Sequence, residues 1–459
     1  MVREEIKRHL YEKYIRPTEH SIQRLIGVEI EMPVVNLSGG ATDYAVAQGA
    51  ARRTMEHFGF IPEKFDDNGV CFSATEPKTG DNLSFDCAYN NLELSLGCEK
   101  DIDIIQERFQ KYVSFLNQEL GKENHTLTGM GVNPFYQVNR RDFIPSERYR
   151  MLERYLQKSS IWSVPMYFHD YPAFGAFASA SQVQLDVDIH RLIPTLKAFS
   201  LVEPVKAVLF SNALLDSEPD LLCVRDLFWE NSTHGINPHN IGMFDCPLES
   251  VDDLLEYICT TSIFCTMRSG RYLHFKPIPI TDYLEREQVT GEYYADGAYH
   301  EITFQPAVED LDYLRTYKFE DLTFRGTIEF RSACCQPFAD AMTVAAFHVG
   351  LMDQVEPLLQ LMENDRVLYH HGYSAGELRK IMNRRDWPEF VDRAGLKALC
   401  LAVLDLAREN LVQRGLGEEK FLLPLYQRAE TLTSPGRVMA EALEQGVTRS
   451  EISRKYAEF

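Results

Sequence analysis

Two glutamates stand two positions apart in a segment with the composition of a β-strand. Glu29 and Glu31 occur in Gly-Val-Glu-Ile-Glu-Met-Pro, and alternate residues of a strand point to the same face. Two carboxylates on one face repel each other unless water or a cation separates their charges. A solvated strand face is the common explanation of such a pair. A site for a divalent cation is the alternative.

Three other strand-like segments carry pairs of polar side chains: Gln182 with Gln184 and Glu329 with Arg331, each two positions apart, and Asp86 with Glu93, seven positions apart. Each pair alone is explained by a solvated face or a cross-strand ion pair. If the four strands converge, their side chains could gather in one funnel of oxygen ligands, which Mg²⁺ and Mn²⁺ prefer. Because neither common glycine-rich phosphate motif is present, a nucleotide would be held through metal ions and arginines.

The elements that must position these residues alternate along the first three quarters of the chain. The predicted strands are Leu25–Val35, Leu83–Leu96, Ser179–Val187, Ile263–Phe275 and Leu322–Arg331. The predicted helices are 1–20, 43–59, 101–119, 145–157 and 189–214, and the pattern is almost wholly helical from 339 onwards. This order predicts an α+β fold, with an antiparallel sheet flanked by helices. We expect a domain of residues 1–338 and a helical C-terminal region, 339–459, packed on it.

Composition narrows the function further. The chain of 459 residues has 68 acidic and 47 basic side chains and a formal net charge of −21, so nucleic acid is not an expected partner. No apolar run approaches the ~20 residues of a membrane span, and the charged N-terminus differs from a secretory signal. The ten cysteines include no C-x-x-C pair. They are expected to be reduced thiols of a cytoplasmic protein.

A series of motifs, in order from about residue 20 to 355, resembles the glutamate–cysteine ligases. The plant and proteobacterial branch is the most similar, together with the related ligase that opens ergothioneine synthesis. The motifs are Gly-Val-Glu29-Ile-Glu31, Asn91-Leu-Glu93-Leu-Ser95, Gly129-Met-Gly-Val-Asn-Pro134, Pro145-Ser-Glu-Arg148-Tyr149, Ser181-Gln182-Val-Gln184-Leu-Asp186, Glu203-Pro-Val-Lys-Ala, Arg225-x-x-x-Trp229 and Ile328-Glu329-Phe-Arg331. None is specific alone, but their shared order and spacing are.

The resemblance implies a fold like that of glutamine synthetase, in which a curved antiparallel sheet forms a funnel that binds ATP and two or three Mg²⁺ or Mn²⁺ ions. By motif, the metal ligands would be Glu29, Glu31, Asp86, Glu93, Gln182 and Glu329. The catalytic residues would be Glu29, Glu93, Glu329 and Arg331.

Most recognition residues follow from the same motifs: Arg331 would contact phosphate, and the substrate contacts would be Arg148, Tyr149, Gln184, Arg225 and Trp229. Arg325 lies outside the motifs but could reach a phosphate from the same strand as Glu329. A structural salt bridge is an equal explanation of each of Arg148, Arg225 and Arg331, and a core position is an equal explanation of Trp229.

The activity that the resemblance implies is an ATP-dependent carboxylate–amine ligase. It would form γ-glutamylcysteine through γ-glutamyl phosphate, the first step of glutathione biosynthesis, as a monomer or homodimer acting on small molecules. Two alternatives stay open: the same chemistry on another amino donor or acceptor, and a nucleotide- or metal-binding relative without turnover. Asn240 favours the first, since it stands where plant-like relatives have an arginine. Residues 286–312 match nothing in the family and would be a lid or a variable surface loop.

Overall fold

The computed structural model describes residues 2–20, 22–244 and 246–459. Its main feature is a nine-stranded sheet with the order β14-β15-β7-β1-β5-β4-β3-β2, in which β6 also pairs with β1. The strands are β1 (Ile26–Asn36), β2 (Ile61–Phe65), β3 (Cys71–Thr75), β4 (Asn82–Phe85), β5 (Asn91–Glu99), β6 (His125–Leu127), β7 (Ser181–Asp186), β14 (Glu320–Leu322) and β15 (Thr327–Phe330). Their pairings are antiparallel, as predicted.

Two of the predicted strands of this large sheet are each two paired strands. The segment Leu83–Leu96 divides into β4 and β5, and Leu322–Arg331 divides into the end of β14 and β15. Gly326, with a φ of 77°, lies in the turn between β14 and β15, where the left-handed conformation costs glycine little. The alternation of polar and apolar residues predicts these strands but not the turns that divide them.

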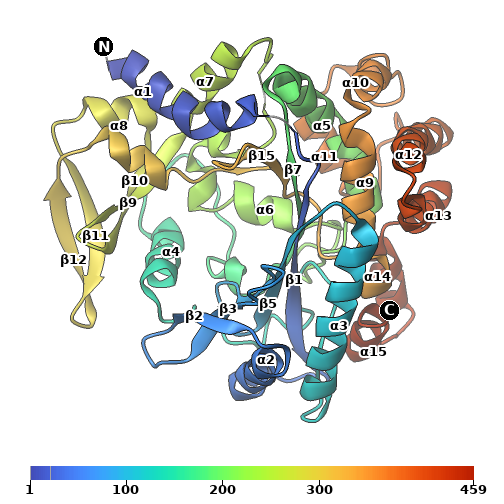
Figure 1. Cartoon of the computed structure of the whole chain (residues 1–459), viewed down its shortest axis with the longest axis horizontal. Helices are drawn as coiled ribbons and strands as arrows, with labels where there is room; N and C mark the ends of the chain where they lie inside the picture. The colour runs from blue at the N-terminus through green and yellow to red at the C-terminus, as the bar shows by residue number, and fades with distance from the viewer. Residues whose placement is uncertain (1, 21, 245) are drawn as a thin grey trace.

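Alternation along β1 separates an apolar face of the sheet from a polar one. Val28, Ile30 and Met32 are buried, whereas Glu29 and Glu31 point to the opposite face. Helix α9 (Thr343–Met352) contacts β1 and β7, and α3 (Ile102–Gly121) contacts β5. These helices lie together beside the sheet (Figure 1). The opposite, polar face of the sheet is therefore the candidate location of the functional site.

A second sheet of four strands has the order β12-β11-β10-β9, with β9 (Ser262–Arg268), β10 (Arg271–Pro279), β11 (Val289–Ala295) and β12 (Ala298–Phe304). The predicted strand Ile263–Phe275 is therefore the β9–β10 hairpin. Most of segment 286–312, predicted to be a lid or loop, forms the β11–β12 hairpin. Glu292 on β11 accepts hydrogen bonds from Arg154 Nε at 3.0 Å and Lys158 Nζ at 2.5 Å, which tie this hairpin to the end of α4 (Glu147–Gln157).

The remaining helices flank the sheets, and those beyond residue 339 form the predicted helical C-terminal region. They are α1 (Val2–Leu10), α2 (Tyr44–Phe58), α5 (Ile189–Phe210), α6 (Arg225–Glu230), α7 (Val251–Thr260), α8 (Ile280–Glu285), α10 (Val355–Glu363), α11 (Ala375–Met382), α12 (Arg393–Arg414), α13 (Leu423–Thr431), α14 (Pro435–Glu444) and α15 (Arg449–Tyr456). The N-terminal helix predicted over 1–20 is α1 followed by a short π-helix and a short 3₁₀-helix. Residue 1 lies outside the described residues.

One hydrophobic core includes Phe330 of β15 and Phe347 of α9, so the C-terminal helices pack directly on the rest of the chain. The α+β class, the antiparallel sheet and the helical C-terminal region are thus confirmed, while a domain boundary at 338 stays a prediction. In the described part of the chain, no helix is both long enough and apolar enough to cross a membrane.

Candidate active site

The predicted acids lie close together on the polar face of the large sheet. In the strand register, Glu31 on β1 is opposite Glu93 on β5, and Glu29 is opposite Gln182 on β7. Residues opposite each other in antiparallel strands have Cβ atoms about 5 Å apart. Glu31 Oε1 accepts a hydrogen bond from Gln182 Nε2 at 2.9 Å, and Glu31 Oε2 accepts one from the Ala180 backbone N–H at 2.8 Å.

A second group of the predicted residues is joined by an amide. Gln184 Nε2 donates to Glu29 Oε1 and to Glu329 Oε1, both at 2.9 Å. Glu329 also forms an ion pair with Arg331, two positions along the chain. Arg325, in the turn before β15, donates to Gln184 Oε1 at 2.5 Å. One polar network therefore includes Glu29, Gln184, Arg325, Glu329 and Arg331.

Three carboxylates are arranged to hold a metal ion. One oxygen from each of Glu31, Asp86 and Glu93 lies within 4.8 Å of the others. Gln182 Oε1 beside them is buried, and the described residues give it no hydrogen-bond partner, which is an unusual state for a buried amide oxygen. A set made of oxygen donors alone fits Mg²⁺ or Mn²⁺ rather than Zn²⁺. The residues present therefore fit the metal that the family resemblance implies.

Burial and mutual repulsion make the charged form of these acids costly. Burial, with added repulsion from Glu93 and Glu329, raises the pKa of Glu29 to about 8. Burial, with added repulsion from Asp86, raises the pKa of Glu93 to about 7. The same causes raise the pKa of Glu31 well above its usual range. Protons or cations must therefore neutralise part of this cluster near neutral pH.

These raised pKa values predict how stability depends on pH in the metal-free protein. A carboxyl whose folded pKa exceeds its unfolded pKa binds more protons when folded, so its stabilising contribution is lost as pH rises. For Glu29 this window runs from about 4.5 to about 8. We expect the Tm to fall over that window and to fall less steeply in Glu29→Gln, in differential scanning calorimetry with a chelator. Equal slopes in the two proteins would contradict the assignment.

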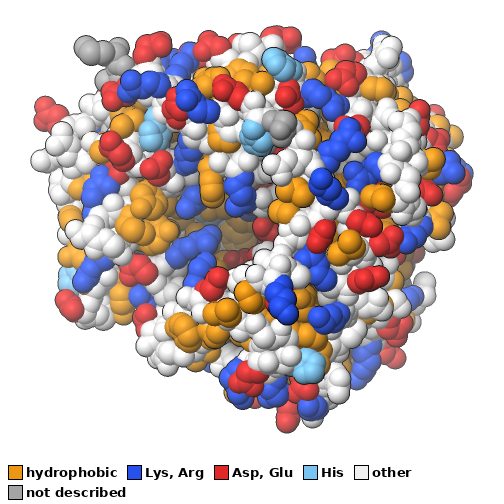
Figure 2. Space-filling model, in the orientation of Figure 1, with side chains coloured by type: hydrophobic (Ala, Val, Ile, Leu, Met, Phe, Trp, Pro, Cys, Tyr) orange, Lys and Arg blue, Asp and Glu red, His pale blue; other side chains and the backbone are white. Residues whose placement is uncertain are grey.

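A pocket of about 130 Å³ opens beside the acids. The predicted residues that line it are Glu31, Asp86, Arg148, Tyr149, Gln182, Arg225, Trp229 and Arg331. The other predicted residues, Glu29, Glu93, Gln184, Arg325 and Glu329, are not among its lining residues but lie on the adjoining strands and turn. Figure 2 shows a hollow near the middle of this face, with Lys and Arg side chains at its edge.

The arginines of the pocket differ in what holds them. Arg225 is buried, and its guanidinium donates to the carbonyls of Arg331, Ser332 and Ala333 at 3.1–3.3 Å, so it fixes the backbone after β15. Arg148 is exposed on α4 and is the arginine best placed to meet a ligand. Tyr149 is buried beside it, with its hydroxyl donating to Asp86 Oδ1 at 3.2 Å.

An aromatic wall closes another side of the pocket. Trp229 stacks on Tyr317, with ring centroids 4.7 Å apart, and meets the edge of Phe174 at 5.0 Å. Tyr317, Phe174 and His234 line the same pocket. Burial lowers the pKa of His234 to about 3, so this imidazole is neutral. Trp229 therefore fills both of the roles considered for it, as a packed aromatic and as a pocket wall.

Several residues of the site were missed in the sequence. Asp226 and Ser332 line the pocket, and each directly follows an arginine that the motifs included. Asp321 on β14 is opposite Glu329, and burial raises the pKa of Asp321 to about 6. Strand alternation is the signal that would reveal Asp321, but β14 is too short for alternation to be recognised in the sequence.

Asn240, which raised doubt about the amino-acid specificity, is used by the fold. Its Nδ2 donates to the Ser262 carbonyl and its Oδ1 accepts from the Ser262 N–H, both at 2.7 Å. It is 3% exposed and is not among the residues that line the pocket. Asn240 therefore bonds to the backbone of Ser262 and does not face the pocket.

No family model matches the sequence, but several curated proteins are similar to it. The chloroplastic glutamate–cysteine ligase of Solanum lycopersicum is 21% identical over 330 residues, covering 68% of this chain and 56% of that protein. The Nicotiana tabacum enzyme is 22% identical over 332 residues, with coverages of 68% and 56%. Ligase B of Oryza sativa subsp. japonica is 22% identical over 334 residues, with coverages of 69% and 59%.

These matches support the resemblance of this chain to the glutamate–cysteine ligases. The family resemblance inferred from the ordered motifs is thereby confirmed. The chain spans less than two thirds of the length of these plant glutamate–cysteine ligases, so their activity is carried over below only as a proposal.

Solved structures give weaker matches. A bifunctional glutathione synthetase from Pasteurella multocida has a TM-score of 0.46 at 11% identity, covering 99% of this chain and 52% of that one. The glutamate–cysteine ligase of Francisella tularensis in complex with AMP has a TM-score of 0.43 at 12% identity, with coverages of 95% and 89%. Because both TM-scores are below 0.5, the resemblance to this family rests on the sequence matches.

Proposed function

We propose that this protein is an ATP-dependent carboxylate–amine ligase that joins glutamate to cysteine through γ-glutamyl phosphate. The observation that carries the proposal is the sheet face on which Glu29, Glu31, Glu93 and Glu329 meet beside a pocket lined by arginines. Divalent cations held by these acids would reverse the local field and so allow a triphosphate to bind beside them. The plant relatives, which are named glutamate–cysteine ligases, support the choice of substrates.

The roles of this chain's residues follow from their positions. Glu31, Asp86 and Glu93, with Gln182 Oε1, would hold one Mg²⁺, while Glu29 and Glu329 would share the others. When bound, these ions neutralise charge that develops on the transferred phosphoryl group. Arg331 is held by Glu329 at the pocket and would add a fixed positive charge there. Arg148, exposed in the same pocket, suits the donor's α-carboxylate.

The chemistry needs positioning more than reactive side chains. The donor's γ-carboxylate oxygen attacks the γ-phosphorus of ATP, the bond to the bridging oxygen breaks, and ADP leaves. The amine nitrogen then attacks the acyl carbon, the carbon–oxygen bond to phosphate breaks, and the nitrogen loses a proton. Alignment of reactants in a closed pocket can supply a large part of such rate enhancement.

A second candidate keeps this chemistry and changes the amino acids. The absence of a family arginine at Asn240, whose side chain bonds to Ser262, leaves room for a different donor or acceptor. A relative that binds nucleotide without turnover is less favoured, because the acidic set of the motifs is complete in this sequence.

An ADP-release assay tests the proposal. With Mg²⁺, ATP and glutamate, we expect ADP to appear only when an amine is added, and cysteine to be the best of a panel of amino acids. Detection of γ-glutamylcysteine by mass spectrometry identifies the product. ADP release that another amino acid pair stimulates more strongly would favour the second candidate, and ADP release without amino-acid dependence would contradict ligase activity.

A further inference from the structure

A buried arginine of the C-terminal helical region lies behind the pocket. Arg379 on α11 is 3% exposed. Its Nε and Nη2 donate to the two carboxylate oxygens of Asp226 at 2.9 and 3.0 Å. Its Nη1 donates to Glu203 Oε2 at 2.6 Å and to the Glu203 carbonyl at 3.4 Å, and Nη2 also donates to the Ser332 carbonyl at 3.3 Å. All five donors of the guanidinium are used.

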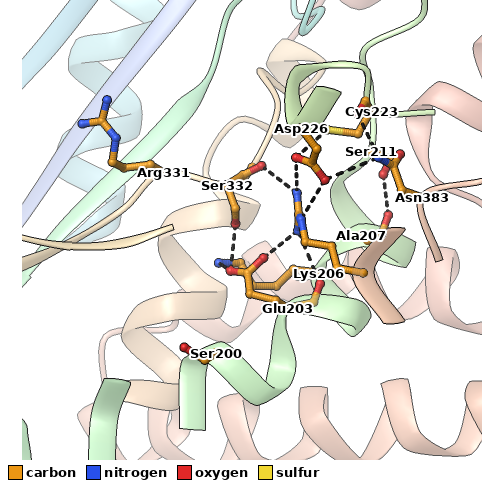
Figure 3. A network of polar contacts seen from close by, with 12 residues as sticks. Ser200, Glu203, Lys206, Ala207, Ser211, Cys223, Asp226, Arg331, Ser332 and Asn383 are labelled. Carbon is orange, nitrogen blue, oxygen red and sulfur yellow. Dashed lines mark hydrogen bonds and ion pairs between the residues drawn. The ribbon is translucent and has the colours of Figure 1, made fainter. Parts of the chain in front are cut away.

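Two of these three partners belong to the pocket wall. Asp226 follows Arg225 in α6, Ser332 follows Arg331 after β15, and both line the pocket. In Figure 3, Asp226, Ser332 and Glu203 point toward a common centre, while Arg331 points away from it. Arg225 Nη1 donates to the same Ser332 carbonyl at 3.2 Å. Two guanidinium groups therefore hold the peptide that carries Arg331.

The third partner anchors this contact in the core. Glu203 on α5 is fully buried, forms an ion pair with Lys206, and accepts a hydrogen bond from Ser332 Oγ at 2.9 Å. Burial alone would raise the pKa of Glu203, but Lys206 and Arg379 lower it to about 2. The carboxylate therefore stays charged. A polar network whose members are paired is rigid and specifies one arrangement.

We propose that Arg379 is a positioning residue, through which the C-terminal helical region fixes α6 and segment 331–333 and so places Arg225 and Arg331 at the pocket. Without the guanidinium, Asp226 would lose two charge-assisted hydrogen bonds and the Ser332 carbonyl one, and both groups would shift toward other partners. A displacement of about 1 Å in a positioning group can cost about 10²-fold in rate. The kinetic part of this inference rests on the proposed function.

Arg379→Lys is the test variant. It keeps the positive charge, but an ammonium group has three donors and cannot reproduce the five hydrogen bonds of the planar guanidinium. Arg414→Lys is the matched control. Arg414 on α12 donates to both carboxylate oxygens of Glu418 at 2.6 and 3.3 Å and to the Lys100 carbonyl at 2.7 Å, and none of these residues lines the pocket.

Two readouts separate positioning from stability. In hydrogen–deuterium exchange, Arg379→Lys is expected to speed exchange in peptides 225–230 and 328–335 about tenfold, whereas Arg414→Lys leaves them unchanged. In the ligase assay, Arg379→Lys is expected to lower kcat/KM for the donor amino acid by about 10²-fold. The loss should appear mainly in kcat, because Arg331, which the network places, would add its charge at the transferred phosphoryl group. Arg414→Lys should keep wild-type kinetics, although both variants lower Tm.

The outcomes that overturn the inference are specific. Unchanged exchange in both peptides would do so, as would faster exchange with unchanged kinetics. If the wild type releases no ADP with any amino acid pair, the proposed function fails, and the exchange comparison alone decides the role of Arg379. If Arg379→Lys does not fold, Asp226→Asn weakens the same contact from the pocket side and is expected to give the same changes.

Discussion

Replacing Glu329 by glutamine is expected to lower the rate of ATP turnover by about 10²–10³-fold, the usual cost of losing one charge-stabilising contact in an active site. Glu329 shares Gln184 with Glu29 and holds Arg331, so the substitution would remove a proposed metal ligand and would also release an arginine. Glutamine preserves the size of the side chain. Steady-state ADP release at saturating Mg²⁺ measures the effect.

The same variant is expected to remain folded. Removing one negative charge from an acidic cluster relieves repulsion, so the Tm of Glu329→Gln without metal should equal or exceed that of the wild type. Glu63→Gln is a matched control, because Glu63 lies on the exposed edge strand β2 of the same sheet. Turnover near the wild-type rate in Glu329→Gln, or an equal loss in Glu63→Gln, would contradict the assignment.

Removal of divalent ions is expected to abolish turnover altogether, with recovery on adding Mg²⁺ or Mn²⁺. The same ions should stabilise the fold in the absence of nucleotide, since they bind a cluster whose charges repel. At a concentration one hundred times Kd, a ligand that binds only the folded state adds about 2.7 kcal/mol to its stability. A thermal melt with a chelator and with added Mg²⁺ measures this difference.

Glu31→Gln separates this metal effect from a general effect of salt. Glu31 belongs to the group of three oxygen donors, so its substitution should weaken the Mg²⁺-dependent rise in Tm. Glu63→Gln should leave the rise intact. A rise of equal size in Glu31→Gln would show that Mg²⁺ acts elsewhere.

Strand alternation predicted the central part of this site because it is local. Glu29 with Glu31, and Gln182 with Gln184, share a face simply because they are two residues apart in strands. The contact between Glu31 and Glu93 could not be predicted from alternation alone, because it depends on the antiparallel register of β1 and β5. Convergence of four distant strands was a hypothesis from the sequence, which the order β15-β7-β1-β5 satisfies.

Other features depend on tertiary contacts that leave no local signal. Arg379 lies on a short amphipathic helix where an arginine usually faces water, yet it is buried against Asp226 and Glu203. The β11–β12 hairpin contains none of the family motifs from which the site residues were predicted. The motif of Arg225 allowed a substrate contact or a structural salt bridge, and it did not show that the guanidinium donates to backbone carbonyls.

The proposed function depends on the joint binding of a divalent ion by carboxylates that are far apart in the sequence. Anomalous diffraction from crystals soaked with Mn²⁺ tests this binding most directly. We predict an anomalous peak within coordination distance, about 2.0–2.5 Å, of oxygens of Glu31, Asp86 and Glu93. Crystals of Glu31→Gln should lose that peak or show it weakened. Fully occupied Mn²⁺ peaks at other positions, with none among these three carboxylates, would contradict the account.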